Sequence, residues 1–226
     1  MRCWWSLMLA CVMTSVLACA QEQTVRTSII VHTDPKFAND ARLLESVLRV
    51  SSRLIAAVRQ VPDSQLQTRD LRWVITVSRS RAQPRSFVSP DGHIEVATEV
   101  MGLAENEAGL AAILGHEFGH ALTHVREPNL LPAVDESKEE VPLFTLEEEM
   151  DADTIGLSLM ADAGYDPREL LWLWERMKRQ NGDAVDGLAV HLTYDRRMEH
   201  IAQWLPDALF RYQRSHRAPQ RTLPLR

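Results

Sequence analysis

Hydrophobic residues recur every three or four positions along much of the chain, which is the spacing of one face of an α-helix. Between Leu110 and Leu122 this pattern predicts the helix that begins near 105. Thr145 and Glu148 have the spacing of an N-terminal capping box, and Gly164 is predicted to end the helix that they begin. The predicted helices run from 34 to about 59, from 105 to about 125, from 145 to 164, from 166 to about 182, and from about 195.

Shorter segments rich in β-branched and aromatic residues predict strands. Ser28–Val31 and Trp73–Val77 have this composition. Phe87–Ala97 is predicted to form a hairpin around a Pro-Asp-Gly turn, and its second arm alternates Ile94 and Val96 with polar residues. The sequence therefore predicts an α+β fold, mainly helical, with a small antiparallel sheet or hairpin along a cleft beside the next helix. An extended peptide can pair with the edge of such a strand.

The chain of 226 residues is long enough for one packed domain, and its composition, 45% hydrophobic and 25% charged, is ordinary for a globular protein. Its net charge of −6 argues against a nucleic-acid partner. The connection from 131 to 142 is either a lid or a solvated linker, and the sequence leaves both open. The predicted division is a signal segment at 1–19, a linker at 20–33, a catalytic domain at 34–210 and a basic, disordered tail at 211–226.

The segment His116-Glu117-Phe118-Gly119-His120 carries the clearest chemistry. Residues four apart on a helix lie on one face, so His116 and His120 can direct their imidazoles at one ion. Glu117 lies beside the first histidine, where its carboxylate can reach a water bound to that ion. The pattern H-E-x-x-H on a helix is typical of zinc hydrolases, which use two histidine ligands and a glutamate as general base.

A catalytic zinc ion takes three protein ligands and keeps one position open. No histidine follows His120 at the H-x-x-G-x-x-H spacing, and His124 lies too far along the helix axis to share the ion easily. The glutamates at 147–149 on the next predicted helix remain as candidates. Glu149 and Asp153 are four residues apart and face one way, which suits a ligand and an acid that orients a ligand histidine.

Several segments resemble the zinc metallopeptidases that include bacterial HtpX and the CaaX prenyl proteases. Glu149–Asp153 is similar to the family's E-x-x-A-D signature, and Asn106–His120 follows the run that leads into its H-E-x-x-H motif. Ser89–Ile94 is similar to its P-G-G-x-I turn, and Gly164–Pro167 matches its G-Y-D-P step. The resemblance covers about 34 to 204 and is greatest to the small periplasmic branch, such as LoiP and BepA.

This resemblance implies roles for individual residues. The family has an H-P-x-x-x-x-R element, which His191 and Arg197 match here with Leu192 in place of the proline. That histidine would lie near the metal, where it and Tyr194 could stabilise an oxyanion. The other implied roles are one zinc ion per subunit held by His116, His120 and Glu149, with Glu117 as catalytic base and with Asp153 and Arg197 supporting the ligands.

The implied function is a zinc-dependent metalloendopeptidase that acts on unfolded or misassembled proteins of the bacterial envelope. The alternatives are a chaperone or assembly factor for outer-membrane proteins with a capped or latent zinc site, and a metal-binding scaffold without activity.

The N-terminal segment is typical of a signal peptide. An apolar run ends at Leu17-Ala18-Cys19-Ala20, which is either a lipoprotein box with Cys19 lipidated or a cleavage site after Ala20. We therefore expect a location on the periplasmic side of the bacterial envelope, anchored by lipid to the outer membrane, with a soluble periplasmic or secreted protein as the alternative. All three cysteines lie within the first 19 residues, so no cysteine is expected to bind the metal.

Overall fold

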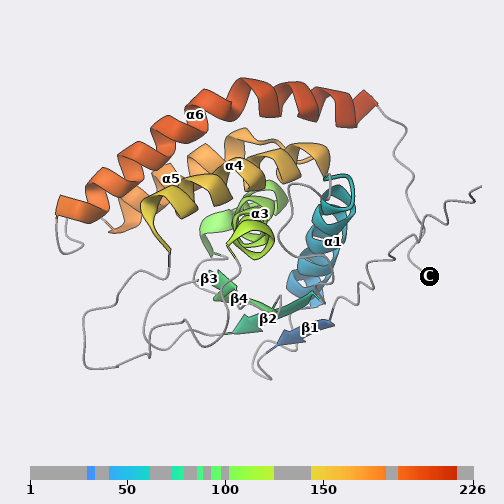
Figure 1. Ribbon diagram of the computed structural model, residues 1–226. Coiled ribbons are helices and arrows are strands. Elements are labelled where there is room, and N and C mark those ends of the chain that lie inside the picture. Colours follow the sequence, from blue (N-terminus) through green and yellow to red (C-terminus); the bar gives the residue numbers. More distant parts are fainter. Residues whose placement is uncertain are drawn as a thin grey trace, which may run out of the picture.

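The helices lie together on one side of a small sheet in the computed structural model (Figure 1). The structure describes residues 30–33, 41–61, 73–78, 86–88, 93–97, 102–124, 144–181 and 188–217. The helices are α1 (Ala41–Val58), α3 (Glu107–Thr123), α4 (Leu146–Asp162), α5 (Arg168–Asn181) and α6 (Leu188–Arg217), and the strands are β1 (Ile30–Thr33), β2 (Val74–Ser78), β3 (Ser86–Val88) and β4 (His93–Ala97). The predicted class, α+β and mainly helical, is confirmed.

The sheet has the strand order β1-β2-β4-β3. Strands β3 and β4 pair in antiparallel fashion, which confirms the predicted hairpin, with Phe87 opposite Glu95. Strand β2 is parallel to both β1 and β4, so the sheet as a whole is mixed rather than antiparallel. The alternation in β4 is also confirmed, because Ile94 and Val96 are both fully buried.

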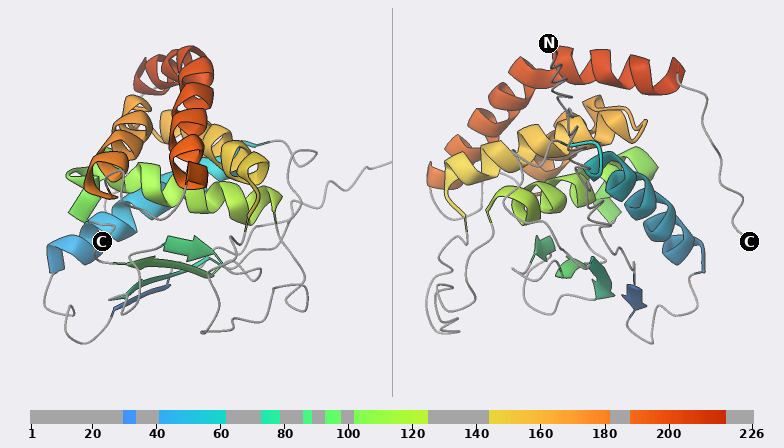
Figure 2. Two further views of the ribbon diagram at one scale, coloured as in Figure 1. Left: turned by 90° about the vertical axis from the view of Figure 1, so that its left-hand side faces the viewer. Right: turned by 45° about the vertical axis from the view of Figure 1, so that its right-hand side comes forward.

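Helix α3 occupies the centre of the molecule. It lies between the sheet and the layer formed by α4, α5 and α6, as both views of Figure 2 show. Its residues from Gly109 to Leu122 are almost all buried, and the Phe118 ring meets Trp73 edge-on with ring centroids 4.4 Å apart. A helix buried on all sides carries apolar residues around its whole circumference. Charged side chains on such a helix therefore need a specific reason to be there.

Helices α3 and α4 pack with their backbones unusually close. A Cβ atom at Gly119 would lie 2.5 Å from the carbonyl oxygen of Ala152, and one at Gly156 would lie 2.9 Å from the carbonyl carbon of Gly115. These distances leave no room for a side chain at either glycine. The small residues therefore let the two helices that carry the candidate ligands approach each other closely.

Both predicted ends of α4 are confirmed. The Thr145 hydroxyl accepts a hydrogen bond from the backbone N–H of Glu148 at 3.2 Å, and the Glu148 carboxylate accepts one from the backbone N–H of Thr145 at 2.7 Å. Gly164 follows the helix with a φ of +78°, a left-handed conformation that favours glycine. Helix α5 then begins after Pro167, as predicted.

Helix α6 differs from the prediction at both ends. It begins at Leu188 rather than near 195, and it continues to Arg217, past the predicted boundary at 211. The arginines at its end suggested a disordered tail, but Arg211 forms a 2.8 Å ion pair with Asp162 of α4. Ile201 and Ala208 are buried before this boundary, and the partly buried Tyr212 packs against the core just beyond it.

Several predictions fall outside the described residues. They concern the helix start at 34, the connection from 131 to 142, the N-terminal segment with Cys19, and the end of the chain from 218. Among the described helices, none combines the length and the apolar character that crossing a bilayer requires.

Candidate metal centre

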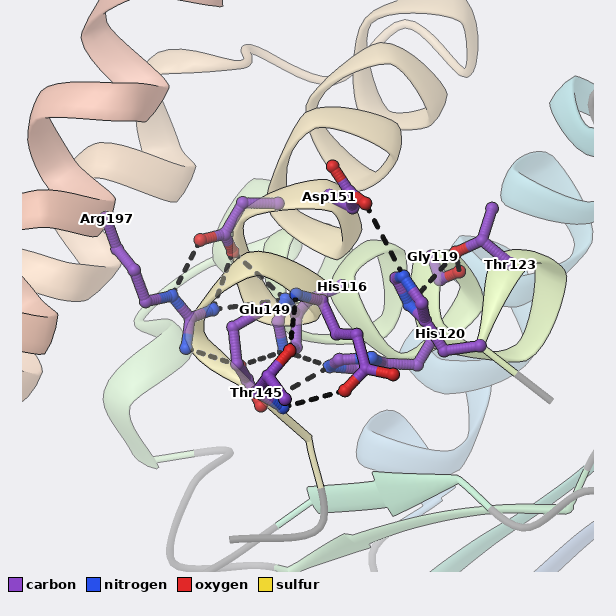
Figure 3. Close-up of polar contacts among 11 residues, drawn as sticks. His116, Gly119, His120, Thr123, Thr145, Glu149, Asp151 and Arg197 are labelled. Carbon is purple, nitrogen blue, oxygen red and sulfur yellow. Dashed lines mark hydrogen bonds and ion pairs between the residues drawn. The ribbon is translucent and has the colours of Figure 1, made fainter. Parts of the chain in front are cut away.

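Helices α3 and α4 bring three candidate ligands together (Figure 3). The Nε2 atoms of His116 and His120 lie 3.1 Å apart. The Glu149 carboxylate lies 3.3 Å from His116 Nε2 and 3.6 Å from His120 Nε2. Tetrahedral ligands with bonds of about 2.0–2.1 Å to zinc lie about 3.3 Å from one another. The spacing of these atoms therefore fits one ion of this size, and no other such group occurs within the described residues.

The structure distinguishes Glu149 from the neighbouring glutamates. The Glu148 carboxylate is taken up by the capping box, and Glu147 lines a separate pocket between α4 and α6. His124 is not part of the group: its ring lies 5.5 Å from that of His120, and its Nε2 lies 3.7 Å from Asp151. Of the three glutamates that the sequence left open, only Glu149 faces the histidine pair.

Asp153 and Arg197 surround the candidate ligands, where the family resemblance placed them. The carboxylate of Asp153 lies 3.0 Å from Nδ1 of His116, which orients the ring so that Nε2 faces Glu149. Arg197 of α6 donates to both oxygens of Asp153 at 2.7 and 2.8 Å, and to Glu149 at 2.5 Å. The guanidinium therefore ties both carboxylates of α4 to α6.

The charges of this group favour a cation. Burial alone would lower the pKa of His116, but hydrogen bonds to Asp153 and Glu149 outweigh it and raise the pKa to about 9. The pKa of Glu149 lies well below its usual range because the histidines and Arg197 outweigh the cost of burial. Arg197 pairs with both Glu149 and Asp153, and a proton on His116 supplies a second positive charge beside these carboxylates. A cation held by His116 would take the place of that proton, and two imidazoles with one carboxylate are a donor set that zinc binds.

His120 differs from His116 in its surroundings. Burial lowers its pKa to about 4, so the ring is neutral near pH 7 and has a lone pair for a metal. Phe144 stacks on it with centroids 3.7 Å apart and planes 13° apart. Nδ1 of His120 is buried and has no hydrogen-bond partner among the described residues. No sequence pattern predicted this role of Phe144. The only signal in the sequence is its position just before the cap residue Thr145.

Glu117 is buried beside the first histidine, with 5% of its surface exposed. Burial raises its pKa to about 7, and the nearby Glu149 carboxylate acts in the same direction. A general base works best when its pKa is near the working pH. The carboxylate therefore has the properties that its predicted role requires.

Trp174 of α5 is also part of the site. It is buried, and its ring lies over the guanidinium of Arg197, 3.7 Å from Cζ to the ring centroid. Its helical spacing carries no signal for this contact, because Arg197 comes from another helix.

The predicted role of His191 stays a prediction. This residue lies near the start of α6, and its side chain is outside the described set. Tyr194 is buried, with its ring 5.7 Å from that of Trp174.

The fold and this site are those of a zincin-like domain, in which an H-E-x-x-H helix and a glutamate from a second helix could hold a metal. Comparison with known proteins agrees, because residues 46–130 match the model of Peptidase family M48. That segment contains His116, Glu117 and His120 but ends before Glu149.

The curated relatives carry one name. The mitochondrial metalloendopeptidase OMA1 of Saccharomyces cerevisiae is 30% identical over 174 residues, covering 64% of this chain and 50% of that protein. The Schizosaccharomyces pombe protein of the same name is 32% identical over 164 residues, covering 62% and 48%. The Arabidopsis thaliana one is 28% identical over 193 residues, covering 76% and 39%. The chain therefore spans about half the length of the yeast relatives. Part of the chain therefore matches the model of Peptidase family M48, and the relatives that it resembles are named metalloendopeptidases.

These relatives correct one prediction. The expected location on the periplasmic side of a bacterial envelope is contradicted, because the matched relatives are named as mitochondrial proteins. The error arose from treating the apolar segment before Cys19 as a bacterial signal, and that segment lies outside the described residues. The narrower resemblance to HtpX, the CaaX proteases, LoiP and BepA is not confirmed by relatives that carry the OMA1 name.

Proposed function

We propose that this chain hydrolyses internal peptide bonds of proteins with a zinc ion held by His116, His120 and Glu149. The observation that carries the proposal is the convergence of these three side chains, with ligand atoms within 4.8 Å of one another, next to the buried carboxylate of Glu117. When bound, zinc would activate a water molecule and polarise the carbonyl of the scissile bond.

The side chains of the protein divide the remaining work. Glu117 takes a proton from the attacking water and returns it to the leaving amine. Asp153 holds the His116 ring through Nδ1, and Arg197 holds Asp153 and Glu149 in turn. A rigid ligand set keeps its geometry while the substrate reacts.

We also assign oxyanion stabilisation to His191, with a smaller contribution from Tyr194. The support is the match of His191 and Arg197 to one family element and the position of Arg197 at the ligands. A hydrogen-bond donor directed at the developing negative charge would lower the barrier.

The proposed substrates are unfolded or misassembled proteins, whose backbones are extended and accessible. Strand β3 stands at one end of the described strand order and offers an edge with which such a backbone could pair. A chaperone with the same fold would bind these chains without cleaving them, and nucleic acid is not an expected partner.

Casein digestion by the purified full chain tests the proposal. We expect cleavage with zinc, none after chelation, and none by Glu117→Gln, which should still bind zinc because it leaves all three ligands in place. Glu147→Gln is the matched control, since that glutamate lies on the far side of α4 from the ligands, and it should cleave normally. Full cleavage by Glu117→Gln would rule out the mechanism. Binding of unfolded casein without cleavage by the zinc-loaded wild type would favour the chaperone.

A further inference from the structure

Arg197 connects the polar side chains of the site. Its guanidinium is contacted both at its edge and on one face. Within its plane, the N–H groups donate to Asp153 and Glu149. On one face lies the ring of Trp174, 3.7 Å from Cζ to the centroid. The same ring lies edge-on to His116, with centroids 6.2 Å apart. Trp174 therefore contacts both the arginine that holds the carboxylates and His116, one of the candidate ligands.

The chemistry of Trp174 indicates what it contributes. It is buried, and its Nε1 has no hydrogen-bond partner among the described residues. A buried donor without a partner is unfavourable, and a leucine or phenylalanine would avoid that cost. Among the aromatic side chains, tryptophan has the most negative electrostatic potential on its ring face. This potential attracts a guanidinium, most strongly where water is excluded.

We propose that Trp174 is a positioning residue for the metal centre. It holds the Arg197 guanidinium in the one plane that lets it bridge Asp153 and Glu149, and through them it sets the geometry of His116 and Glu149. Glu149 and Asp153 lie four residues apart on α4, so a single guanidinium can reach both only in a restricted orientation. This inference rests on the proposed zinc site, but not on cleavage of any substrate.

The measurement is zinc affinity of the purified full chain, by competition with a chromogenic chelator. We expect Trp174→Leu to weaken zinc binding about tenfold, and Trp174→Phe, which keeps an aromatic face, to weaken it no more than about threefold. The matched control is Trp172→Leu on the same helix, where an exposed ring pairs with Arg168 at 5.7 Å, and it should leave zinc affinity unchanged.

A double-mutant cycle separates positioning from mere packing. In an Arg197→Gln background, Trp174→Leu should add less than about twofold, because the residue through which Trp174 acts is gone. A Trp174→Leu variant that binds zinc as tightly as the wild type, or that loses the same factor in both backgrounds, would overturn the proposal.

A second measurement stands even where Trp174→Leu does not fold. Biosynthetic fluorination of tryptophan weakens the negative face of the ring with little change of shape. Labelled wild type should bind zinc at least about threefold more weakly than unlabelled protein, whereas labelling should not affect Trp174→Phe. Equal responses of the two proteins would overturn the role of the ring face. Zinc binding without cleavage by the wild type would instead overturn the proposed function and leave this inference standing.

Discussion

The two candidate histidine ligands come from one helix, four residues apart, but they are held in opposite ways. His116 lies among charged groups, with Asp153 at Nδ1 and Arg197 beyond it. Behind Nε2, which lies 3.6 Å from Glu149, the His120 ring is held by stacking on Phe144, and its Nδ1 has no partner within the described part of the chain. One side of the centre therefore depends on electrostatics and the other on packing, and each should respond to different perturbations.

The largest effect should come from a change that disturbs both sides at once. Gly119→Ala places a methyl group 2.5 Å from the carbonyl oxygen of Ala152, so α3 and α4 must separate. We expect a loss of about 2–3 kcal/mol in unfolding free energy, as for other overpacked cores, together with a large loss of zinc affinity. Denaturant titration and chelator competition measure the two. Gly102→Ala is the control, because nothing lies within 4 Å of its added methyl, and it should be nearly neutral. A stable, zinc-binding Gly119→Ala would show that close helix contact is not required.

Asp153→Asn should disrupt the charged contacts that hold His116. This change removes the negative charge that orients His116 and pairs with Arg197, so we expect zinc affinity to fall about 10–100-fold. Competition with a chelator gives the value. Asp151→Asn, on the exposed side of the same helix, should bind zinc like the wild type. Similar losses in both variants would mean that only the net charge of α4 matters.

The charged side should also give the protein a pH-dependent stability in the presence of a chelator. The pKa of His116 is raised to about 9, above the usual value of 6.5 for histidine. The folded protein therefore keeps a proton that the unfolded chain releases, so this stabilisation is complete below pH 6.5 and is lost as the pH rises to about 9. We expect unfolding free energy to fall by about 2–3 kcal/mol across this range, and this fall to be absent in His116→Asn. Glu117, with a pKa of about 7, adds to the fall only at its lower end. A flat profile for the wild type would contradict the prediction.

A change to the ring stacked on His120 should have the smallest effect on zinc affinity. Phe144→Ala removes a stacked ring worth about 0.5–1.5 kcal/mol, so we expect zinc affinity to fall no more than about tenfold, with little dependence on salt. The ratio of zinc affinities at low and high salt checks this. Phe144→Leu should retain part of the effect through bulk alone. A strong salt dependence would show that this side is electrostatic after all.

The fold and the central motif could be predicted because they depend on local patterns. The spacing of His116 and His120, the capping box at Thr145 and the glycine at 164 each act within one or two turns of helix. The continuation of α6 past 211 could not be predicted, because it rests on contacts such as Arg211 with Asp162, far away in the sequence. The contacts of Phe144 and Trp174 were missed for the same reason.

The choice of the ligand among three consecutive glutamates could be predicted only in part. Residue types alone left Glu147, Glu148 and Glu149 equivalent, while the spacing to Asp153 and the family resemblance favoured the last. The structure gives the physical basis, since the cap engages one of them and the turn of the helix points another away. The family resemblance also pointed to Arg197, which no local pattern in the sequence connects to the site.

Two adjacent carboxylates in the first turn of α4 have unrelated roles. Glu148 closes the helix onto Thr145, and Glu149 faces the histidines. Inserting one residue between the cap and Glu148 would bring Glu148 to the position that faces the histidines, and deleting one there would move Glu149 to the cap position. Changes of chain length before Phe144 would leave that alignment intact, so evolution can remodel the preceding connection while the count from threonine to ligand stays fixed.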